Sequence, residues 1–362
     1  MSGVQTSRAD LIYMKQALKL AKQGWGKVNP NPLVGALIVK ENRIISEGYH
    51  RQAGQPHAEY EALLNAHESV KGATLYVNLE PCFHYGKTPP CVNMIIEAGI
   101  DRVVIANRDP NPQVNGQSIT LLRENGITVT EGILASAGRK LNERFFTWIE
   151  KKRPFIALKL ALTLDGKIAD IDGNSKWITN PYARRYVHHL RAGFDALLTG
   201  AGTIRCDNPQ LTVRYGRHRH NPYRLIVSYS GDLPPDAHIF SQNQDQKTRL
   251  ISPTYNESLK ELDYILLPTG SQSCFTASDL IDAIYRAGYS SVFIEAGEQL
   301  SALFLDEKWV DRIYLFYGPV ILGPGKSPFQ QMTIRSLTTA KRIKFPRYRQ
   351  FDDCFMIEGA LE

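Results

Sequence analysis

Apolar residues near the start of the chain recur at helical spacing and stop before two glycines, which predicts an opening helix. The pattern consists of Leu11, Met14, Leu18 and Ala21, followed by Gly24 and Gly26. Two short apolar runs, 34–39 and 43–47, then flank Glu41-Asn42 and predict antiparallel strands joined by a tight turn.

From residue 57 onward, helical and strand patterns alternate, which is typical of an α/β domain. In chain order the pattern predicts helix 57–66, strand 73–78, helix 90–98, strand 102–106, helix 117–124, strand 127–132 and one long helix 136–150. We expect one mainly parallel sheet, because a helix separates each of these strands from the next.

The charge run Lys151-Lys152-Arg153-Pro154 marks the best domain boundary, since its proline stops the preceding helix. The pattern after it predicts strand 155–163, a turn at Asp165-Gly166, helix 181–191 begun by Asn180, strands 195–200 and 224–228, a linker-like stretch 241–247, helix 277–286, strand 291–297, helix 298–305 and the β-rich segments 312–323, 342–350 and 353–359, the last two joined as a hairpin at Phe351-Asp352. A length of 362 residues exceeds what one core usually serves. We therefore predict two α/β domains, 1–150 and 154–362.

Composition points to a folded protein of the cytoplasm. Hydrophobic residues make up 43% of the chain and charged residues 22%, and no apolar run approaches the ~18 residues that span a membrane. The first ten residues lack the apolar core of a secretory signal, and Cys206, Cys274 and Cys354 show no disulfide pattern. The net charge of +7 is interspersed with acidic residues, so a small anionic substrate or a phosphorylated cofactor fits it as well as nucleic acid does.

A histidine and two cysteines around a glutamate carry the clearest chemistry. His57 and Glu59 should lie in the first turn of one helix, with Cys82 at the start of the next helix and Cys91 just inside it. One imidazole and two thiolates suit a tetrahedral zinc site whose fourth position stays open for water. Zinc lowers the pKa of that water to about 7, and the non-ligating Glu59 can carry its proton. The cluster therefore predicts hydrolytic deamination with Glu59 as the catalytic residue.

The cluster matches the zinc deaminase pattern H-x-E…P-C-x-x-C except in its last spacing. Eight residues, 83–90, separate the two cysteines here. This long loop brings His84 and Lys87 to the rim of the pocket, where a donor and a cation could hold a polar ring or a phosphate. His84 also leaves a second interpretation open, in which it completes a purely structural site with four protein ligands.

The segments NPNPLVGALIV, PHAE and PCFHYGKTPPC resemble the deaminase half of the bifunctional riboflavin-biosynthesis deaminase–reductases. This resemblance implies that the first domain is a cytidine-deaminase-like three-layer α/β/α domain. It also implies that Asn31, His84 and Lys87 contact the substrate. The amide of Asn31 offers a donor and an acceptor to a pyrimidinone edge, and an asparagine in a proline-rich loop also fits an ordinary turn.

The second half lacks the G-x-G-x-x-G fingerprint of an ordinary dinucleotide-binding fold. Glycines after two predicted strands, at 200–203 and 296–297, could cradle a phosphate, and each group also fits an ordinary turn. The order of LKLALTLDGKIA, SKWIT, LRAGFDALLTGAGTIRCDNPQLTVR and VFIEAG resembles the reductase half of the same family. That resemblance implies a dihydrofolate-reductase-like α/β domain that uses NADPH.

The resemblance assigns roles to two groups of residues in this half. Cofactor contacts fall on Ala161, Trp177, Thr203, Asp207 and Gly297. Substrate contacts fall on Ser175, Arg191, Leu211, Arg214 and Glu295. Lys159, in a strand that faces the same cleft, is a further candidate, which would orient the substrate carbonyl. The residue types suit these roles, because arginines can hold a phosphate, a carboxylate can accept hydrogen bonds from sugar hydroxyls, and a tryptophan can stack on a ring. An arginine at a helix end and a tryptophan beside isoleucine also fit purely structural roles. Ser228-Tyr229 and Glu298 depart from the family pattern, so no cofactor phosphate contact is assigned to them.

Together these features predict a bifunctional enzyme of riboflavin biosynthesis. The first domain, with one Zn²⁺ per chain, would remove the exocyclic amine of 2,5-diamino-6-ribosylamino-4(3H)-pyrimidinone 5′-phosphate. The second domain would reduce the ribosyl group of the product to ribityl with NADPH. We expect a small phosphorylated pyrimidine as substrate, a homo-oligomer, and neither a nucleic-acid nor a membrane partner. Two alternatives stay open: a tRNA or nucleic-acid base deaminase with an accessory domain, and a non-catalytic zinc- or nucleotide-binding module.

Overall fold

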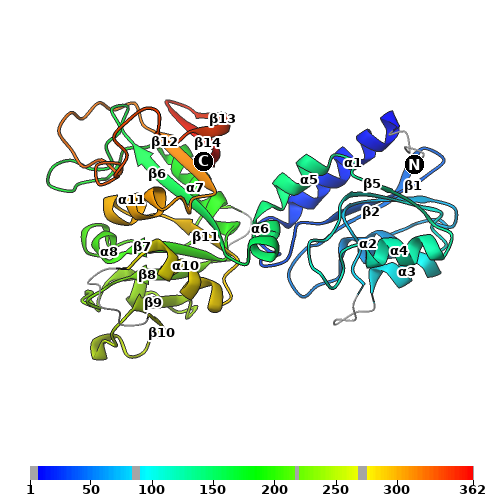
Figure 1. Cartoon of the computed structure of the whole chain (residues 1–362), viewed down its shortest axis with the longest axis horizontal. Helices are drawn as coiled ribbons and strands as arrows, with labels where there is room; N and C mark the ends of the chain where they lie inside the picture. Colours follow the sequence, from blue (N-terminus) through cyan, green and yellow to red (C-terminus); the bar gives the residue numbers. More distant parts are fainter. Residues whose placement is uncertain (1–6, 84–89, 217–219, 268–274, 362) are drawn as a thin grey trace. The chain divides into compact units, whose positions relative to one another are not determined.

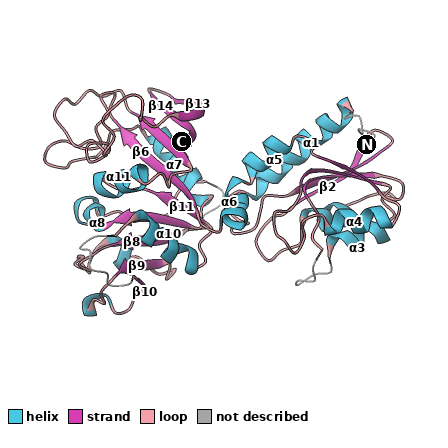
Figure 2. Cartoon of the chain, in the orientation of Figure 1, coloured by secondary structure: helices cyan, strands magenta, loops and turns pink. Residues whose placement is uncertain are grey.

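The computed structural model describes residues 7–83, 90–216, 220–267 and 275–361, so His84 and Lys87 lie outside the described residues. The chain divides into two compact units, Met1–Lys152 (unit 1) and Arg153–Glu362 (unit 2), and the division falls within the charge run at 151–154. In each unit, helices lie against a sheet (Figure 1 and Figure 2). None of the helices in the described ranges is long and apolar enough to cross a membrane.

Unit 1 is built on a five-stranded sheet in the order β2-β1-β3-β4-β5. Its elements are α1 (Arg8–Ala21), the 3₁₀ turn η1 (Lys22–Gly24), β1 (Gly35–Lys40), β2 (Arg43–Tyr49), α2 (Ala58–Leu64), β3 (Thr74–Leu79), α3 (Cys91–Glu97), β4 (Arg102–Asn107), α4 (Gln117–Glu124), β5 (Thr128–Glu131), α5 (Ala135–Leu141) and α6 (Glu143–Lys151). α1 begins where Ser7 and Asp10 form a capping box. The opening helix, the first strand pair and the alternation after them are confirmed.

Helices cover both faces of this sheet and make unit 1 a three-layer α/β/α domain. On one face, apolar side chains of α1 such as Met14 pack with Leu37 of β1. On the other face, α2 and α3 contribute residues such as Ala62 and Ile95, which pack with Val103 of β4. Because successive strand residues point to opposite faces, a sheet buried on both sides needs apolar residues at nearly every position.

The predictions for the sheet and for the last helix of unit 1 are wrong. The sheet is mixed rather than mainly parallel, because β1 runs antiparallel to both β2 and β3, while β3–β4 and β4–β5 are parallel. The long helix predicted over 136–150 is broken at Asn142 into α5 and α6. The buried side chain of Asn142 accepts from the N–H of Leu33 at 2.8 Å and donates to its carbonyl at 2.9 Å. A contact this distant in sequence leaves no trace in a local helical pattern.

Unit 2 contains a nine-stranded sheet in the order β10-β9-β8-β7-β11-β6-β12-β14-β13. Its elements are β6 (Phe155–Leu162), α7 (Pro181–Ala192), β7 (Ala196–Gly200), α8 (Ala201–Asp207), β8 (Tyr223–Val227), α9 (His238–Ser241), β9 (Thr248–Ser252), η2 (Glu257–Leu259), β10 (Asp263–Leu266), α10 (Ala277–Arg286), β11 (Ser291–Ile294), α11 (Glu298–Asp306), β12 (Arg312–Tyr317), β13 (Ile343–Phe351) and β14 (Cys354–Leu361). Neighbouring strands from β10 to β12 are parallel, and β14 runs antiparallel to β12 and β13.

Alternate residues of β6 face the two apolar layers of unit 2. Ile156 packs in the layer that includes α10 and α11, whereas Phe155 packs in the layer that includes α7. Lys159 and Ala161 lie on the same face of β6 as Phe155, and both are partly exposed. The carboxyl ends of parallel strands such as β6, β7 and β11 are where open α/β sheets bind ligands.

The terminal hairpin is confirmed, with its turn at Asp352-Asp353, one residue later than predicted. The prediction of a linker over 241–247 is wrong. Asn243 and Asp245 in this stretch bond the guanidinium of Arg224, which is only 1% exposed. A buried cation on β8 needs these partners, so the stretch is packed against the sheet. The strands β9 and β10 that follow it were not predicted.

Candidate active sites

The predicted zinc ligands His57, Cys82 and Cys91 converge in unit 1, with their donor atoms all within 4.8 Å of one another. His57 is the N-cap of α2, and Cys91 is the first residue of α3. Cys82 lies in the non-helical segment after β3 rather than at the start of a helix, which corrects the prediction. The reason is that α3 begins only after Pro90, its N-cap.

This donor set fits a zinc ion. Ligand atoms at tetrahedral zinc distances of about 2.0–2.3 Å lie roughly 3.5 Å apart. Cys91 Sγ lies 3.5 Å from His57 Nδ1, and the N–H of Cys91 donates to Cys82 Sγ at 3.2 Å. Hydrogen bonds from Cys91 and His57 lower the pKa of Cys82, which favours the thiolate that a metal binds. Among the described residues, His57, Cys82 and Cys91 form the group of His, Cys, Asp and Glu side chains whose geometry could hold a metal.

Glu59 lies buried in the first turn of α2, 3% exposed, close to this cluster. Burial raises the pKa of its carboxyl to about 7, against the opposing effect of the His57 charge. A carboxyl that titrates near neutrality can both accept and return a proton. The position and protonation of Glu59 therefore suit general acid–base work beside a metal site.

Asn31 is held by a buried histidine that sequence reasoning missed. His50 follows β2, and its Nδ1 donates to the carbonyl of Pro56 at 3.0 Å. Burial lowers the pKa of His50, so the ring is neutral and its Nε2 accepts from Nδ2 of Asn31 at 3.1 Å. This contact fixes the amide of the exposed Asn31 and leaves its Oδ1 for a ligand. The sequence offered one signal for His50: it follows a predicted strand and precedes the first zinc ligand, His57.

In unit 2, the structure brings Lys159, Arg191 and Glu295 together. Glu295 accepts from Nη2 of Arg191 at 3.1 Å and from Nζ of Lys159 at 3.5 Å, and Nε of Arg191 also donates to it. Burial alone would raise the pKa of Glu295, but the charges of Arg191 and Lys159 outweigh burial and lower it to about 2. Glu295 is therefore a fixed negative charge between two cations.

The predicted cofactor residues leave room for a ligand that carries phosphates. A Cβ built on Gly297 would meet Oγ1 of Thr203 at 3.9 Å, which places these two predicted residues side by side. Cβ atoms built on Gly200 and Gly202 would meet no atom of the described residues within 4 Å. Open backbone of this kind lets N–H groups approach a phosphate, so the site fits a dinucleotide such as NADPH.

Two further predicted positions, Ser175 and Trp177, lie in the loop that follows β6. Ser175 donates from Oγ to Oδ1 of Asp207 at 2.8 Å, which joins a predicted substrate residue to a predicted cofactor residue. Trp177 is 68% exposed, and the guanidinium of Arg184 lies 4.2 Å from its ring centroid. Ser228, in contrast, is buried, and its Oγ accepts from the N–H of Gly231.

Leu211 and Arg214 lie in the segment that follows α8. Nη1 of Arg191 donates to the carbonyl of Thr212 in this segment at 3.0 Å, which ties the segment to the Lys159, Arg191 and Glu295 cluster. Leu211 is buried, whereas Arg214 is exposed. The structure thus joins the 211–214 segment to the Lys159, Arg191 and Glu295 cluster, whereas Ser175 bonds to Asp207.

The fold and the two sites define a class of protein: a zinc-dependent deaminase domain followed by an α/β reductase domain. The family model for the cytidine and deoxycytidylate deaminase zinc-binding region matches residues 7–107, and the model for the RibD C-terminal domain matches residues 154–354. The chain belongs to the family of riboflavin biosynthesis protein RibD, and it is a bifunctional deaminase and reductase.

Full-length relatives support this membership. The riboflavin biosynthesis protein RibD of Aquifex aeolicus is 41% identical, and the match covers 92% of this chain and 94% of the relative. The riboflavin biosynthesis protein RibD of Escherichia coli is 37% identical, and the match covers 97% of this chain and 100% of the relative.

Solved structures agree. A diaminohydroxyphosphoribosylaminopyrimidine deaminase/5-amino-6-(5-phosphoribosylamino)uracil reductase from Thermotoga maritima matches with a TM-score of 0.87, 40% identity and coverage of 97% and 98%. Acinetobacter baumannii RibD matches with a TM-score of 0.90, 34% identity and coverage of 98% and 99%. The predicted fold class and the predicted bifunctional enzyme are confirmed. The base-deaminase and non-catalytic alternatives are therefore set aside.

Proposed function

We propose that unit 1 hydrolyses the exocyclic amine of 2,5-diamino-6-ribosylamino-4(3H)-pyrimidinone 5′-phosphate, and that unit 2 reduces the ribosyl group of the product to ribityl with NADPH. The observation that carries this proposal is the buried Glu59 beside three converging zinc ligands, on one chain with the Lys159, Arg191 and Glu295 cluster. The similar Thermotoga maritima protein is described as a deaminase and reductase of such phosphorylated compounds.

In unit 1, His57, Cys82 and Cys91 would hold one Zn²⁺, which when bound supplies a water of pKa about 7 as nucleophile. Glu59 accepts a proton from the attacking water and returns it to the departing amine, so the products are a ring carbonyl and ammonia. Asn31 presents its Oδ1 to an N–H of the pyrimidinone, because His50 already accepts from its Nδ2.

In unit 2, the protein residues bind and orient the reactants. NADPH when bound supplies the hydride. Lys159, held by Glu295, orients the sugar oxygen. Lys159 and Arg191 together give the cluster around Glu295 a net positive charge, which suits a phosphorylated sugar. The remaining proposed contacts are Ser175, Arg191, Leu211 and Arg214 for the substrate, and Ala161, Trp177, Thr203, Asp207 and Gly297 for the cofactor. His84 and Lys87 complete the proposed substrate contacts of unit 1.

Coupled turnover tests this proposal. The purified chain should bind one equivalent of zinc, release ammonia from the pyrimidine nucleotide, and oxidise NADPH only after that release. Glu59→Gln should slow ammonia release about 10²- to 10⁴-fold, because it cannot carry the proton, while zinc content stays the same. Supplied with the deaminated product, this variant should oxidise NADPH at the wild-type rate. Zinc-loaded wild-type protein that released no ammonia would refute the deaminase assignment.

We also propose that the chain acts as a homo-oligomer. Large apolar side chains of unit 2 are exposed, among them Ile321 at 77%, Phe345 at 81% and Tyr348 at 71%. Phe345 and Tyr348 lie on the same strand, β13, and contiguous apolar surface is often covered by another subunit. Light scattering on the purified chain should give a mass at least twice 40.7 kDa, and a monomer at micromolar concentration would contradict this.

A further inference from the structure

Three consecutive residues of the segment after α8 are each held by one side chain through a backbone group. The carbonyl of Thr212 accepts from Nη1 of Arg191 at 3.0 Å. The N–H of Val213 donates to Oδ1 of Asn221 at 2.8 Å, and the N–H of Arg214 donates to Nδ1 of His188 at 3.2 Å. A loop held at successive backbone groups keeps its side chains in one orientation.

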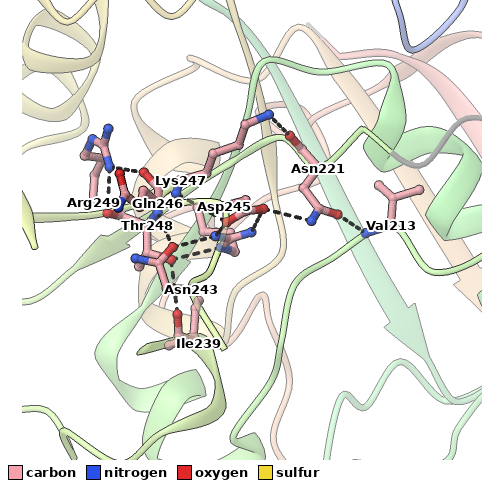
Figure 3. Close-up of polar contacts among 10 residues, drawn as sticks. Val213, Asn221, Ile239, Asn243, Asp245, Gln246, Lys247, Thr248 and Arg249 are labelled. Atoms are coloured by element: carbon pink, nitrogen blue, oxygen red, sulfur yellow. Dashed lines mark hydrogen bonds and ion pairs between the residues drawn. The ribbon is translucent and has the colours of Figure 1, made fainter. Parts of the chain in front are cut away.

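Asn221 is itself fixed from the other side by a charged network (Figure 3). Its side-chain Nδ2 donates to Oδ2 of Asp245 at 2.8 Å, and its backbone carbonyl accepts from Nζ of Lys247 at 2.7 Å. Hydrogen bonds from Arg224 lower the pKa of Asp245 well below its usual range, so this carboxylate only accepts. The amide of Asn221 must therefore turn its nitrogen to Asp245 and its oxygen to Val213.

The network ends in the sheet, which makes it rigid. Arg224 on β8 is 1% exposed and donates from Nη1 to Asp245 at 3.1 Å, from Nη2 to Asn243 at 2.8 Å and from Nε to Thr248 at 2.9 Å. A buried guanidinium with this many partners is costly to disturb. Hydrogen bonds through Asn221 and Asp245 thus connect the backbone of Val213 to the buried Arg224 of unit 2.

His188 fixes the next residue from the opposite side. It lies on α7 one turn before Arg191, is 5% exposed, and accepts the N–H of Arg214 on Nδ1. Burial, reinforced by the charges of Arg191 and Arg214, lowers the pKa of His188 to about 4, so the ring is neutral and free to accept. One face of α7 therefore supplies both a cation for Glu295 and an anchor for Arg214.

The held segment begins at a residue in an unfavourable conformation. Leu211 is buried and has φ of 50°, in the left-handed region that leucine rarely adopts. Such a conformation persists where the surrounding contacts over-determine it, and it is concentrated at binding sites. The bonds at the next three residues supply that constraint.

We propose that Asn221 and His188 are positioning residues of the reductase, which set the backbone of 212–214 so that Leu211 and Arg214 meet the phosphorylated sugar. This rests on the proposed function, in which those two residues contact the substrate. Asn221 and His188 act through the backbone of the segment, and neither touches the reacting atoms. Their loss therefore weakens substrate binding more than it slows hydride transfer.

Steady-state kinetics on the full chain test the proposal. Asn221→Ala and His188→Leu should each raise the KM for the phosphorylated substrate about tenfold or more, with kcat and the KM for NADPH within about twofold of wild type. His188→Asn, whose amide oxygen can replace Nδ1 as acceptor, should restore most of the KM. Asn243→Ala is the control, because it removes a partner of Arg224 without contacting the segment. It should lower Tm as much as Asn221→Ala while leaving the KM unchanged.

Amide hydrogen exchange gives a readout independent of activity. In Asn221→Ala the N–H of Val213, and in His188→Leu the N–H of Arg214, should exchange at least about tenfold faster, with the strands of unit 2 unaffected. Unchanged exchange, an unchanged KM, or an equal KM rise in Asn243→Ala would overturn the positioning role. If instead the wild-type chain oxidised no NADPH while these amides behaved as expected, the reductase assignment would fail and the anchoring of the segment would stand.

Discussion

Three carboxylates show how surroundings set the role of one functional group. Glu59 is buried beside the zinc ligands, and burial raises its pKa to about 7, the range of a proton carrier. Glu295 is mostly enclosed, with its side chain 11% exposed, but two cations outweigh burial and lower its pKa to about 2. Asp10, in α1, is 1% exposed, and bonds from Arg102 and Tyr76 outweigh burial in the same way. The first suits catalysis, whereas the other two are permanent charges that position their partners.

The pH dependence of stability should report on Asp10. Its folded pKa of about 2 lies below the value of about 3.9 for an unfolded aspartate. Its contribution, roughly 2 kcal/mol, is therefore complete above pH ~4 and is lost as the pH falls toward 2. Asp10→Asn should remove this acid-dependent component and destabilise unit 1 by about 2–4 kcal/mol, because Arg102 loses its partner. Scanning calorimetry between pH 2 and pH 6 measures both effects.

A surface pair gives the matched control. Glu150 pairs with Arg139 in the same unit, but both side chains are substantially exposed. Glu150→Gln should change the stability by less than about 1 kcal/mol and leave the acid profile as in wild type. If Asp10→Asn lost no more stability than this control, the pair of Asp10 with Arg102 would not contribute the stability expected here.

At the scale of elements, asparagine side chains hold a proposed substrate loop in both units. In unit 1, Asn142 bonds both backbone groups of Leu33, and Asn78 of β3 accepts from Gly35 and also donates to the Leu33 carbonyl. In unit 2, Asn221 holds Val213. An amide suits this work, because one side chain offers a donor and an acceptor to an extended backbone. Helix α5 therefore ends at Asn142 because its side chain serves the loop that carries Asn31.

Asn142→Ala tests this reading of the helix break. It leaves the buried N–H of Leu33 without its acceptor, which should cost about 1–3 kcal/mol in the stability of unit 1. Asn31 lies two residues away, so the KM for deamination should rise several-fold with less change in kcat. Asn125→Ala, at the exposed end of α4, should stay within about 0.5 kcal/mol of wild type and keep the wild-type KM. A rise in KM in both variants would mean that the effect is not specific to the Leu33 loop.

These elements also show what the sequence could and could not predict. The zinc cluster and most helices were predicted because their signals are local: a short motif, a capping residue such as Asn180, or apolar spacing. The break at Asn142 and the packed stretch 241–247 were mispredicted, because both serve buried groups far away in sequence. His50 and His188 were missed for the same reason, since a buried histidine becomes informative only once its hydrogen-bond partners are known.

At the scale of the whole molecule, the described residues assigned to each reaction all come from one unit. The zinc ligands and Glu59 lie in unit 1, and the Lys159, Arg191 and Glu295 cluster lies in unit 2. Each unit also has its own sheet and its own apolar cores. A chain organised in this way should lose its two activities separately, and the intermediate should be able to pass between chains through solution.

Mixing two singly inactivated full-length chains tests that expectation. Glu59→Gln should reduce the deaminated product but not make it, and Lys159→Met should release ammonia without oxidising NADPH. A mixture in equal amounts should restore NADPH oxidation from the pyrimidine nucleotide at about half the wild-type rate, because each active site is diluted twofold. A mixture that stayed inactive while each chain kept its remaining half-reaction would show that the intermediate is passed within one chain. Loss of ammonia release in Lys159→Met would show instead that the units depend on each other.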